Sequence, residues 1–227
     1  MADFTYDDIA KMLDHSLLQP KLSDQELAAG CQLAAEYGVA SVCIKPYWVR
    51  HASDLLAGSG VAVGTVVGFP QGGNTTAVKA FEAEQAILDG ATELDMVVNI
   101  GKVLSEDWGY VGSEIGTIVR IAREHQAIVK VIFENSMIED RHRIRLCELC
   151  TAVGAAFVKT ATGYGDGGAT DHDLRLMRQH CPAAVGVKAA GGIRTLDRLL
   201  EVRALGVSRV GATASKVILD EVKARLA

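Results

Sequence analysis

Short apolar runs rich in β-branched residues alternate with longer amphipathic segments along the whole chain. Eight of these runs have the length and composition of buried strands, and turn-forming residues separate them from the next amphipathic segment. They lie at residues 14–18, 41–44, 62–68, 93–99, 129–134, 157–160, 185–188 and 208–211. Their starts are 21 to 36 residues apart, which is the length of one strand and one crossover helix. The pattern therefore predicts a repeated strand–helix unit.

The segments between the runs carry helix start and stop signals. Ser23-Asp-Gln-Glu26 is a capping box, and Gly38 stops the helix that begins there. Other helices are predicted at 76–88, over most of 104–125, from Thr170, from Thr195 and at 213–226. A short extra helix is predicted at 6–12, and if the strands close into a barrel, it is expected to cover the N-terminal opening of that barrel.

Eight strand–helix units in 227 residues favour an α/β fold of the (β/α)8 TIM-barrel type, as one domain over residues 1–227. The alternative is an open, doubly wound sheet. That fold usually carries a glycine-rich fingerprint after its first strand, where this chain has Leu17-Leu18-Gln19-Pro20. The glycine-rich loops come after the sixth, seventh and eighth strands instead.

Composition argues against several classes of partner. The net charge of −5 and the pI of about 5.7 disfavour nucleic acid, because a phosphate-tracking surface is usually basic. No apolar stretch is long enough to cross a bilayer, and the N-terminus lacks the features of a signal peptide. The expected location is therefore cytoplasmic.

Cysteine usage agrees with a reducing compartment, since the five cysteines are odd in number and scattered. Cys147 and Cys150 have CxxC spacing, but they lie late in a predicted helix without a second pair. Ordinary helix packing is favoured over a redox or zinc role. The six histidines show no metal-ligand spacing, so no metal is expected.

Lysines at the ends of two neighbouring strands are the most informative feature. Lys159 ends the apolar run Phe157-Val-Lys-Thr160, and Lys188 comes next in Val185-Gly-Val-Lys188. Burial and a nearby cation both lower the pKa of an amine, which can then attack a carbonyl. We therefore predict that Lys159 is a nucleophile activated by Lys188. The competing interpretation is a buried ion pair between Lys159 and Asp95 or Glu134.

Carboxylates lie at other strand ends. Asp95 is suited to moving a proton next to an imine, although it could instead be a structural partner of the lysines. Lys130 and Glu134 share a predicted strand and a face under the alternation of a strand. We expect these two to neutralise each other.

The late loops are suited to a phosphate group. Loop 163–170 lies after the sixth predicted strand, Gly191-Gly192 after the seventh, and Gly211-Ala-Thr-Ala-Ser215 after the eighth. In barrels of this type, backbone N–H groups after the last strands often bind phosphate.

Taken together, the motifs resemble those of the class I 2-deoxyribose-5-phosphate aldolases over nearly the whole chain. The matching segments are Asp14-His-Ser-Leu-Leu18, Ser41-Val-Cys-Ile44, Gly64-Thr-Val-Val-Gly-Phe-Pro70, Glu93-Leu-Asp-Met-Val-Val-Asn-Ile-Gly101, Phe157-Val-Lys-Thr160, Val187-Lys-Ala-Ala-Gly-Gly-Ile-Arg194 and Arg209-Val-Gly211.

The resemblance implies reversible cleavage of 2-deoxy-D-ribose 5-phosphate to D-glyceraldehyde 3-phosphate and acetaldehyde by a homodimer or homotetramer, without a metal or other cofactor. It implies that Lys159 forms the Schiff base and that Lys188 and Asp95 move protons. Cys43, Thr160 and Asp14 are expected to contact substrate. The phosphate is expected at Gly163, Gly191, Gly192, Gly211, Ala212 and Thr213.

Some positions depart from the family's commonest pattern, namely Ala161, Tyr164, the segment Phe133-Glu-Asn-Ser136 and Thr213-Ala214. They bear on the preference between phosphorylated and free sugars. The sequence ends at Ala227, directly after the last predicted helix, so we expect no tail to reach the site. Two other functions stay open: another Schiff-base-forming phospho-aldehyde lyase or transaldolase-like enzyme, and a non-catalytic phosphosugar-binding barrel.

Overall fold

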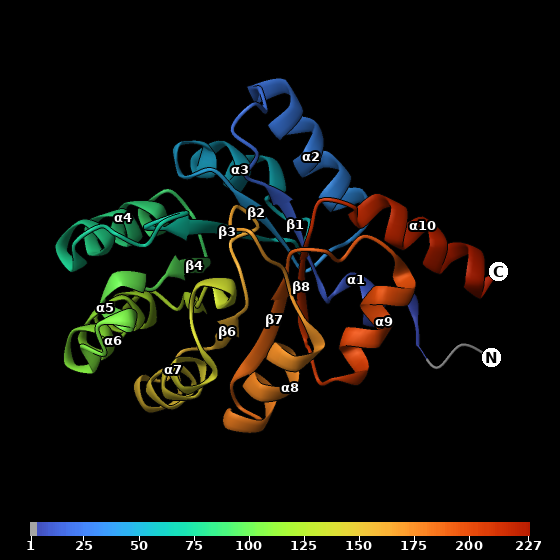
Figure 1. Cartoon of the computed structure of the whole chain (residues 1–227). Coiled ribbons are helices and arrows are strands. Elements are labelled where there is room, and N and C mark those ends of the chain that lie inside the picture. Colours follow the sequence, from blue (N-terminus) through green and yellow to red (C-terminus); the bar gives the residue numbers. More distant parts are fainter. Residues whose placement is uncertain (1–3) are drawn as a thin grey trace.

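The chain forms a closed barrel of eight parallel strands with helices around it (Figure 1). The computed structural model describes residues 4–227. The strands are β1 (Leu13–Leu17), β2 (Ser41–Ile44), β3 (Ala62–Val67), β4 (Glu93–Val97), β5 (Ile128–Ile132), β6 (Phe157–Lys159), β7 (Gly186–Ala190) and β8 (Arg209–Ala212). The barrel closes where Leu13 of β1 pairs with Val210 of β8. The predicted (β/α)8 fold is confirmed, and the open sheet is excluded by this closure.

Helices connect the strands and cover the outside of the barrel (Figure 1). They are α1 (Tyr6–Ala10), α2 (Asp24–Glu36), α3 (Val49–Leu56), α4 (Thr76–Leu88), α5 (Ile100–Leu104), α6 (Trp108–Glu124), α7 (Asp140–Val153), α8 (Asp171–His180), α9 (Leu196–Ala204) and α10 (Ser215–Leu226). Short 3₁₀ turns at Pro46–Trp48 and Asn135–Met137 come after β2 and β5.

Local signals explain where several helices begin. The predicted capping box is present, because the Ser23 hydroxyl accepts the Glu26 N–H and the Glu26 carboxylate accepts the Ser23 N–H. The predicted N-terminal helix is present but ends at Ala10. The Ala10 carbonyl accepts the N–H of Ala40, directly before β2, so α1 lies at the N-terminal end of the barrel.

The helical region predicted at 104–125 consists of the end of α5 and all of α6. Glu106 between them has a φ of 53°, which breaks the helical path. Asp107 then caps α6 by accepting the N–H of Tyr110 at 3.2 Å. The predicted fourth strand is also shorter, because Asn99 is the N-cap of α5.

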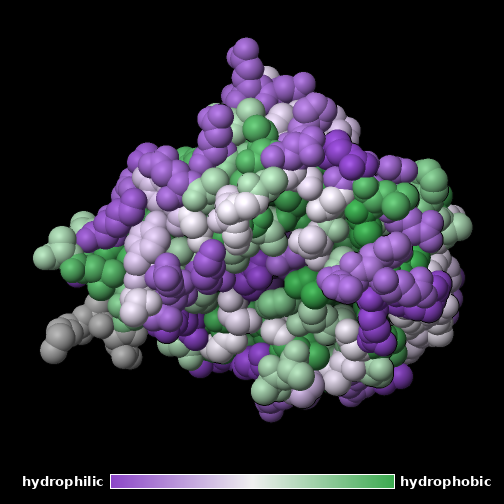
Figure 2. All heavy atoms as spheres, turned by 180° about the vertical axis from the view of Figure 1, so that it is seen from behind, coloured by the Kyte–Doolittle hydropathy of each residue, from purple (hydrophilic) through white to green (hydrophobic). Residues whose placement is uncertain are grey.

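The apolar core fills the layer between barrel and helices. Outward-facing strand residues such as Val42, Leu94 and Val131 are fully buried there. Cys147 and Cys150 of α7 are free thiols and belong to the same core, which agrees with the predicted role in helix packing. Within residues 4–227, no helix is long and apolar enough to cross a membrane. The face seen in Figure 2 mixes hydrophilic and hydrophobic residues.

Candidate active site

The inside of the barrel carries charged side chains where branched apolar ones are usual. Seven of them are joined by ion pairs, and we call this group the barrel cluster: Asp14, Glu93, Asp95, Lys130, Lys159, Lys188 and Arg209. Strand alternation explains the arrangement, because every second residue of a barrel strand points inward. The two aspartates and three lysines are almost completely buried.

Lys159 ends β6 and lies in register with Lys188 of β7. Its Nζ donates to Asp95 Oδ2 at 2.6 Å. Burial lowers the pKa of Lys159, and although Asp95 opposes this, the charge of Lys188 lowers the pKa further. The predicted closeness of the two lysines is confirmed. The competing ion pair with Asp95 is also present, so the two interpretations describe one arrangement.

Asp95 links the two lysines, since its Oδ2 also accepts from Lys188 Nζ at 2.7 Å. Lys188 Nζ lies 2.5 Å from Asp14 Oδ2 as well. Burial alone would raise the pKa of Asp95, but Lys130, Lys159 and Lys188 hold it well below its ordinary value. Asp95 therefore stays a carboxylate and accepts hydrogen bonds from both lysines.

The expected pairing of Lys130 with Glu134 is wrong. Lys130 Nζ lies 2.9 Å from Asp14, 2.5 Å from Glu93 and 3.1 Å from Asp95. β5 ends at Ile132, and Glu134 has a φ of 54°, which turns its side chain away from the strand's alternation. Its carboxylate instead accepts the N–H and the hydroxyl of Thr162, in the loop after β6.

The barrel cluster contains three carboxylates and four cations. Burial would lower the pKa of Lys130, but Asp14, Asp95 and Glu93 raise it well above the ordinary value. Lys188 contacts two carboxylates, whereas Lys159 contacts Asp95 alone and shares it with two other lysines. Since arginine does not deprotonate in proteins, Lys159 is the cation that the cluster can most easily hold neutral.

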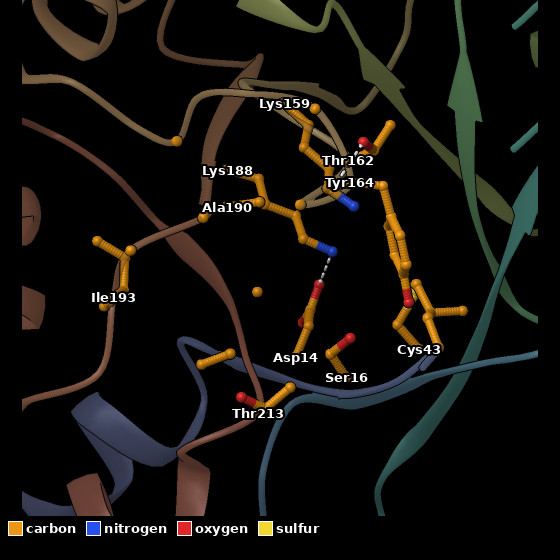
Figure 3. Close-up of a pocket in the computed structure, with 18 of the residues that line it drawn as sticks. Asp14, Ser16, Cys43, Lys159, Thr162, Tyr164, Lys188, Ala190, Ile193 and Thr213 are labelled. Carbon is orange, nitrogen blue, oxygen red and sulfur yellow. Dashed lines mark hydrogen bonds and ion pairs between the residues drawn. The ribbon is translucent and has the colours of Figure 1, made fainter. Parts of the chain in front are cut away.

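A cavity of about 570 Å³ opens above the cluster at the C-terminal ends of the strands. Asp14, Cys43, Lys159 and Lys188 are among its lining residues, together with Ser16. Figure 3 shows both lysines extending into the cavity from neighbouring strands, with an ion pair between Asp14 and Lys188. This volume is suited to a small ligand.

Two predicted site residues do not line the cavity. The Thr160 hydroxyl donates to the Ala190 carbonyl and accepts the Ala190 N–H, at 3.1 and 3.0 Å. We expected Thr160 to contact substrate, but it joins β6 to β7 and is fully buried. Asp95 lies behind the lysines and reaches the cavity only through them.

All six residues predicted to bind phosphate line the cavity: Gly163, Gly191, Gly192, Gly211, Ala212 and Thr213. Gly191 and Gly192 have φ of 88° and 89°, so their backbone adopts a path that other residues avoid. In the described chain, no side chain caps the N-terminus of α10, which begins directly after this loop. Its N–H groups are available to an anion.

Sequence reasoning missed several residues of the site. Glu93 and Arg209 appeared only as parts of motifs, yet both belong to the barrel cluster. Arg194 lines the cavity next to the glycine pair and adds a cation there. Strand alternation could have identified Glu93, because it lies two residues before Asp95 and therefore on the same face of the strand. Among residues 4–227, no group of three or more His, Cys, Asp or Glu side chains could hold a metal ion.

Comparison with known proteins agrees with this geometry. Residues 8–213 match the family described as DeoC/LacD family aldolase. A protein named deoxyribose-phosphate aldolase, from Rhodopirellula baltica, is 55% identical over 226 residues, covering 100% of this chain and 94% of the relative.

Solved structures give the same result. The structure titled "QR15, an Aldolase" has a TM-score of 0.91 and 35% identity, covering 96% of this chain and 97% of its own. A deoxyribose phosphate aldolase from Aeropyrum pernix, described as having a unique tetrameric structure, has a TM-score of 0.90 and 30% identity. That match covers 97% of this chain and 93% of the other.

Proposed function

The chain belongs to the DeoC/LacD family of aldolases, and from this premise we propose how its own residues cleave 2-deoxy-D-ribose 5-phosphate reversibly to D-glyceraldehyde 3-phosphate and acetaldehyde. One observation carries the proposal. An amine with a lowered pKa lies at the floor of a cavity whose other side is formed by glycine-rich loops. The first feature suits an aldehyde and the second a phosphate.

Lys159 is the nucleophile of the proposed reaction. Its neutral amine attacks C1 of the open-chain sugar, and loss of water from the carbinolamine gives a protonated imine. The imine accepts the electron pair of the C2–C3 bond as that bond breaks, while the C3 hydroxyl loses its proton. D-glyceraldehyde 3-phosphate leaves, and an enamine stays on Lys159. Protonation of the enamine at C2 and hydrolysis of the imine release acetaldehyde.

Lys188 and Asp95 move the protons. Lys188 lines the cavity and can deliver a proton to the carbinolamine hydroxyl or to C2 of the enamine. Asp95 accepts hydrogen bonds from both lysines through one oxygen, so it links the nucleophile to the proton donor. Asp14 holds Lys188 from the other side. Cys43 lines the same cavity, and burial raises its pKa to about 11, so its thiol stays neutral.

The phosphate lies at the loops after β6, β7 and β8 in this proposal. Gly191, Gly192 and Thr213 offer backbone N–H groups beside the uncapped start of α10, and Arg194 adds a charge. Figure 3 places Ile193 and Thr213 on one side of the lysines and Tyr164 and Cys43 on the other. The sugar would therefore span the cavity between these sides. The reaction itself uses protein groups alone and requires neither a metal nor a cofactor.

We also propose a homodimer or homotetramer in the cytoplasm. The tetramer described for the Aeropyrum pernix relative and the five free thiols support this. Light scattering coupled to size-exclusion chromatography tests the assembly, and a monomer at micromolar concentration would contradict it.

Reductive trapping tests the mechanism. The protein is incubated with acetaldehyde and cyanoborohydride, digested, and mapped by mass spectrometry, while acetaldehyde release from deoxyribose 5-phosphate is measured separately. We expect one ethyl adduct, on Lys159, and turnover of the phosphorylated sugar. An adduct on another lysine, or tight binding of the sugar phosphate without turnover, would contradict the proposal.

A further inference from the structure

Four members of the barrel cluster do not line the cavity: Glu93, Asp95, Lys130 and Arg209. Two of these, Glu93 and Arg209, form no ion pair with Lys159 or Lys188. Arg209 of β8 donates to Asp14 Oδ1 at 2.6 Å and to both carboxylate oxygens of Glu93, at 2.8 and 3.1 Å. A further bond joins it to the Ser41 hydroxyl at 3.1 Å. Both side chains are about a tenth exposed. Neither lines the cavity, and the proposed reaction assigns them no step.

We propose that Arg209 and Glu93 are positioning residues with opposite electrostatic effects on the nucleophile: Arg209 makes Lys159 the neutral lysine of the cluster, and Glu93 limits that effect. This inference rests on the proposed function of Lys159. It gives a reason for an arginine at the base of a barrel interior that apolar side chains could have filled.

The balance of charge in the cluster supports this role. With Arg209 present, four cations face three carboxylates, and one lysine must lose its proton for the charges to balance. Without Arg209, three lysines would face three carboxylates, and each could stay charged. Without the Glu93 charge, two cations would be in excess, so Lys159 would hold its proton less firmly. Buried charge without a partner is costly, so the protonation state depends on this balance.

Distance makes the effect measurable. Lys159 of β6 lies in register with Lys188 of β7, and Lys188 lies in register with Arg209 of β8. The backbones of Lys159 and Arg209 are therefore two strand spacings, roughly 10 Å, apart. At an effective dielectric constant of about 20, one unit charge at that distance shifts a proton equilibrium by roughly one pH unit.

Apart from Arg209 and Glu93, the charged and titratable groups around Lys159 are the same in every variant of the test. Charged and titratable side chains face it from nearly every strand, together with Tyr164 from the loop after β6, whereas β3 contributes the apolar Val66. They are Asp14 on β1, Cys43 on β2, Asp95 with Glu93 on β4, Lys130 on β5, Lys188 on β7 and Arg209 on β8.

The experiment measures the rate of Lys159 adduct formation with acetaldehyde and cyanoborohydride from about pH 5 to pH 10. Only the neutral amine attacks, so the rate rises with pH through the pKa of Lys159. We expect R209M to move this midpoint up by roughly one pH unit and E93Q to move it down by a similar amount. The double variant R209M/E93Q again has one surplus cation, so its midpoint should return towards that of the wild type.

R209K is the matched control, because it keeps the charge and loses the planar fork that bonds two carboxylates. A midpoint close to that of the wild type in R209K, with a raised midpoint in R209M, supports an electrostatic role over general damage. Circular dichroism and thermal unfolding show which variants fold. If the arginine variants do not fold, E93Q alone must still show the downward shift.

Two outcomes overturn the inference. In the first, R209M and E93Q move the midpoint in the same direction, and in the second, both leave it in place. A normal Lys159 adduct with unmoved midpoints removes this inference and leaves the proposed function standing. No adduct in the wild-type protein removes the proposed function, and the inference with it.

Discussion

Two buried groups of ion pairs invite comparison, the barrel cluster and the pair Lys79–Glu114 between α4 and α6. Lys79 Nζ lies 2.9 Å from Glu114 Oε1 and donates to the Val97 carbonyl at 2.7 Å. Glu114 Oε2 accepts the Asn99 N–H at 3.0 Å. Both side chains of the pair are completely buried. Burial lowers the pKa of Lys79 despite Glu114, just as burial lowers that of Lys159.

Burial and a lowered pKa therefore do not distinguish a reactive lysine from a structural one. Lys79 has a carboxylate of its own, so its pair is balanced, and it does not line the cavity. Lys159 shares one carboxylate with two other lysines and opens onto the cavity. A surplus of positive charge and access to ligand make the difference.

Paired substitutions at the two lysines give the largest expected effects. K159L should lower turnover of deoxyribose 5-phosphate by on the order of 10⁴-fold or more, because the covalent intermediate cannot form. It should not lower the free energy of unfolding, since it replaces the lysine that the cluster holds neutral with an apolar side chain of similar volume and leaves the remaining charges balanced. K79M should do the reverse: turnover stays close to wild type, and the free energy of unfolding falls by about 3–5 kcal/mol.

Acetaldehyde release and urea unfolding measure the two effects. The double variant K79M/E114M is the control, because removing both charges should restore most of the stability that K79M loses. If K159L is as unstable as K79M, the two sites do not differ in charge balance, and the comparison is wrong.

The fold and the main site residues could be predicted from sequence, because strand spacing and polar residues at strand ends are local signals. Lys79 carries no such signal, since only the packing of α4 on α6 buries it. The error at Glu134 comes from extending β5 past Ile132, where a left-handed residue ends the alternation.

Thr160 shows an error that the sequence could have prevented. Alternation along β6 directs Thr160 away from the interior when Lys159 points inward. Arg209, by contrast, could not be placed below Lys159 without the register that closes the barrel. Local patterns identify which side chains point inward, and long-range strand pairing decides which of them meet.

His15 extends the comparison to a buried group with no ion pair among the described residues. It lies on the outer face of β1 with Nδ1 3.0 Å from the Ser215 hydroxyl. Burial lowers its pKa to about 4, from 6.5 for an ordinary histidine. Folding therefore holds it neutral, and the stability this contributes is present above pH 6.5 and lost as pH falls towards 4.

The full loss amounts to about 3 kcal/mol in the free energy of unfolding. Urea unfolding at pH values across this window should show it for the wild type. In H15Q the same decrease should be smaller by that amount, because glutamine does not titrate. Parallel curves for the two proteins would show that His15 is protonated equally in both states.

Tyr164 tests the second part of the comparison, access to the cavity, and has the smallest expected effect. Its ring meets Phe69 edge to face with centroids 5.4 Å apart, and it lines the cavity beside Cys43. Burial raises its pKa, with a further contribution from Cys43, so the hydroxyl stays protonated and can donate to substrate. Y164F keeps the ring and removes this donor. We expect kcat/KM to fall by roughly 2–10-fold, the value of one hydrogen bond.

The ratio of kcat/KM for deoxyribose 5-phosphate to kcat/KM for deoxyribose decides how that loss is interpreted. Tyr164 lies across the lysines from Thr213 and Ile193 (Figure 3), so Y164F should lower kcat/KM equally for deoxyribose 5-phosphate and deoxyribose. R194M is the counterpart on the phosphate side, because it removes the cation proposed there, and it should lower only the value for the phosphorylated sugar. If Y164F changes the ratio instead, the loop after β6 reaches the phosphate, and the cavity is not divided in the way its lining residues indicate.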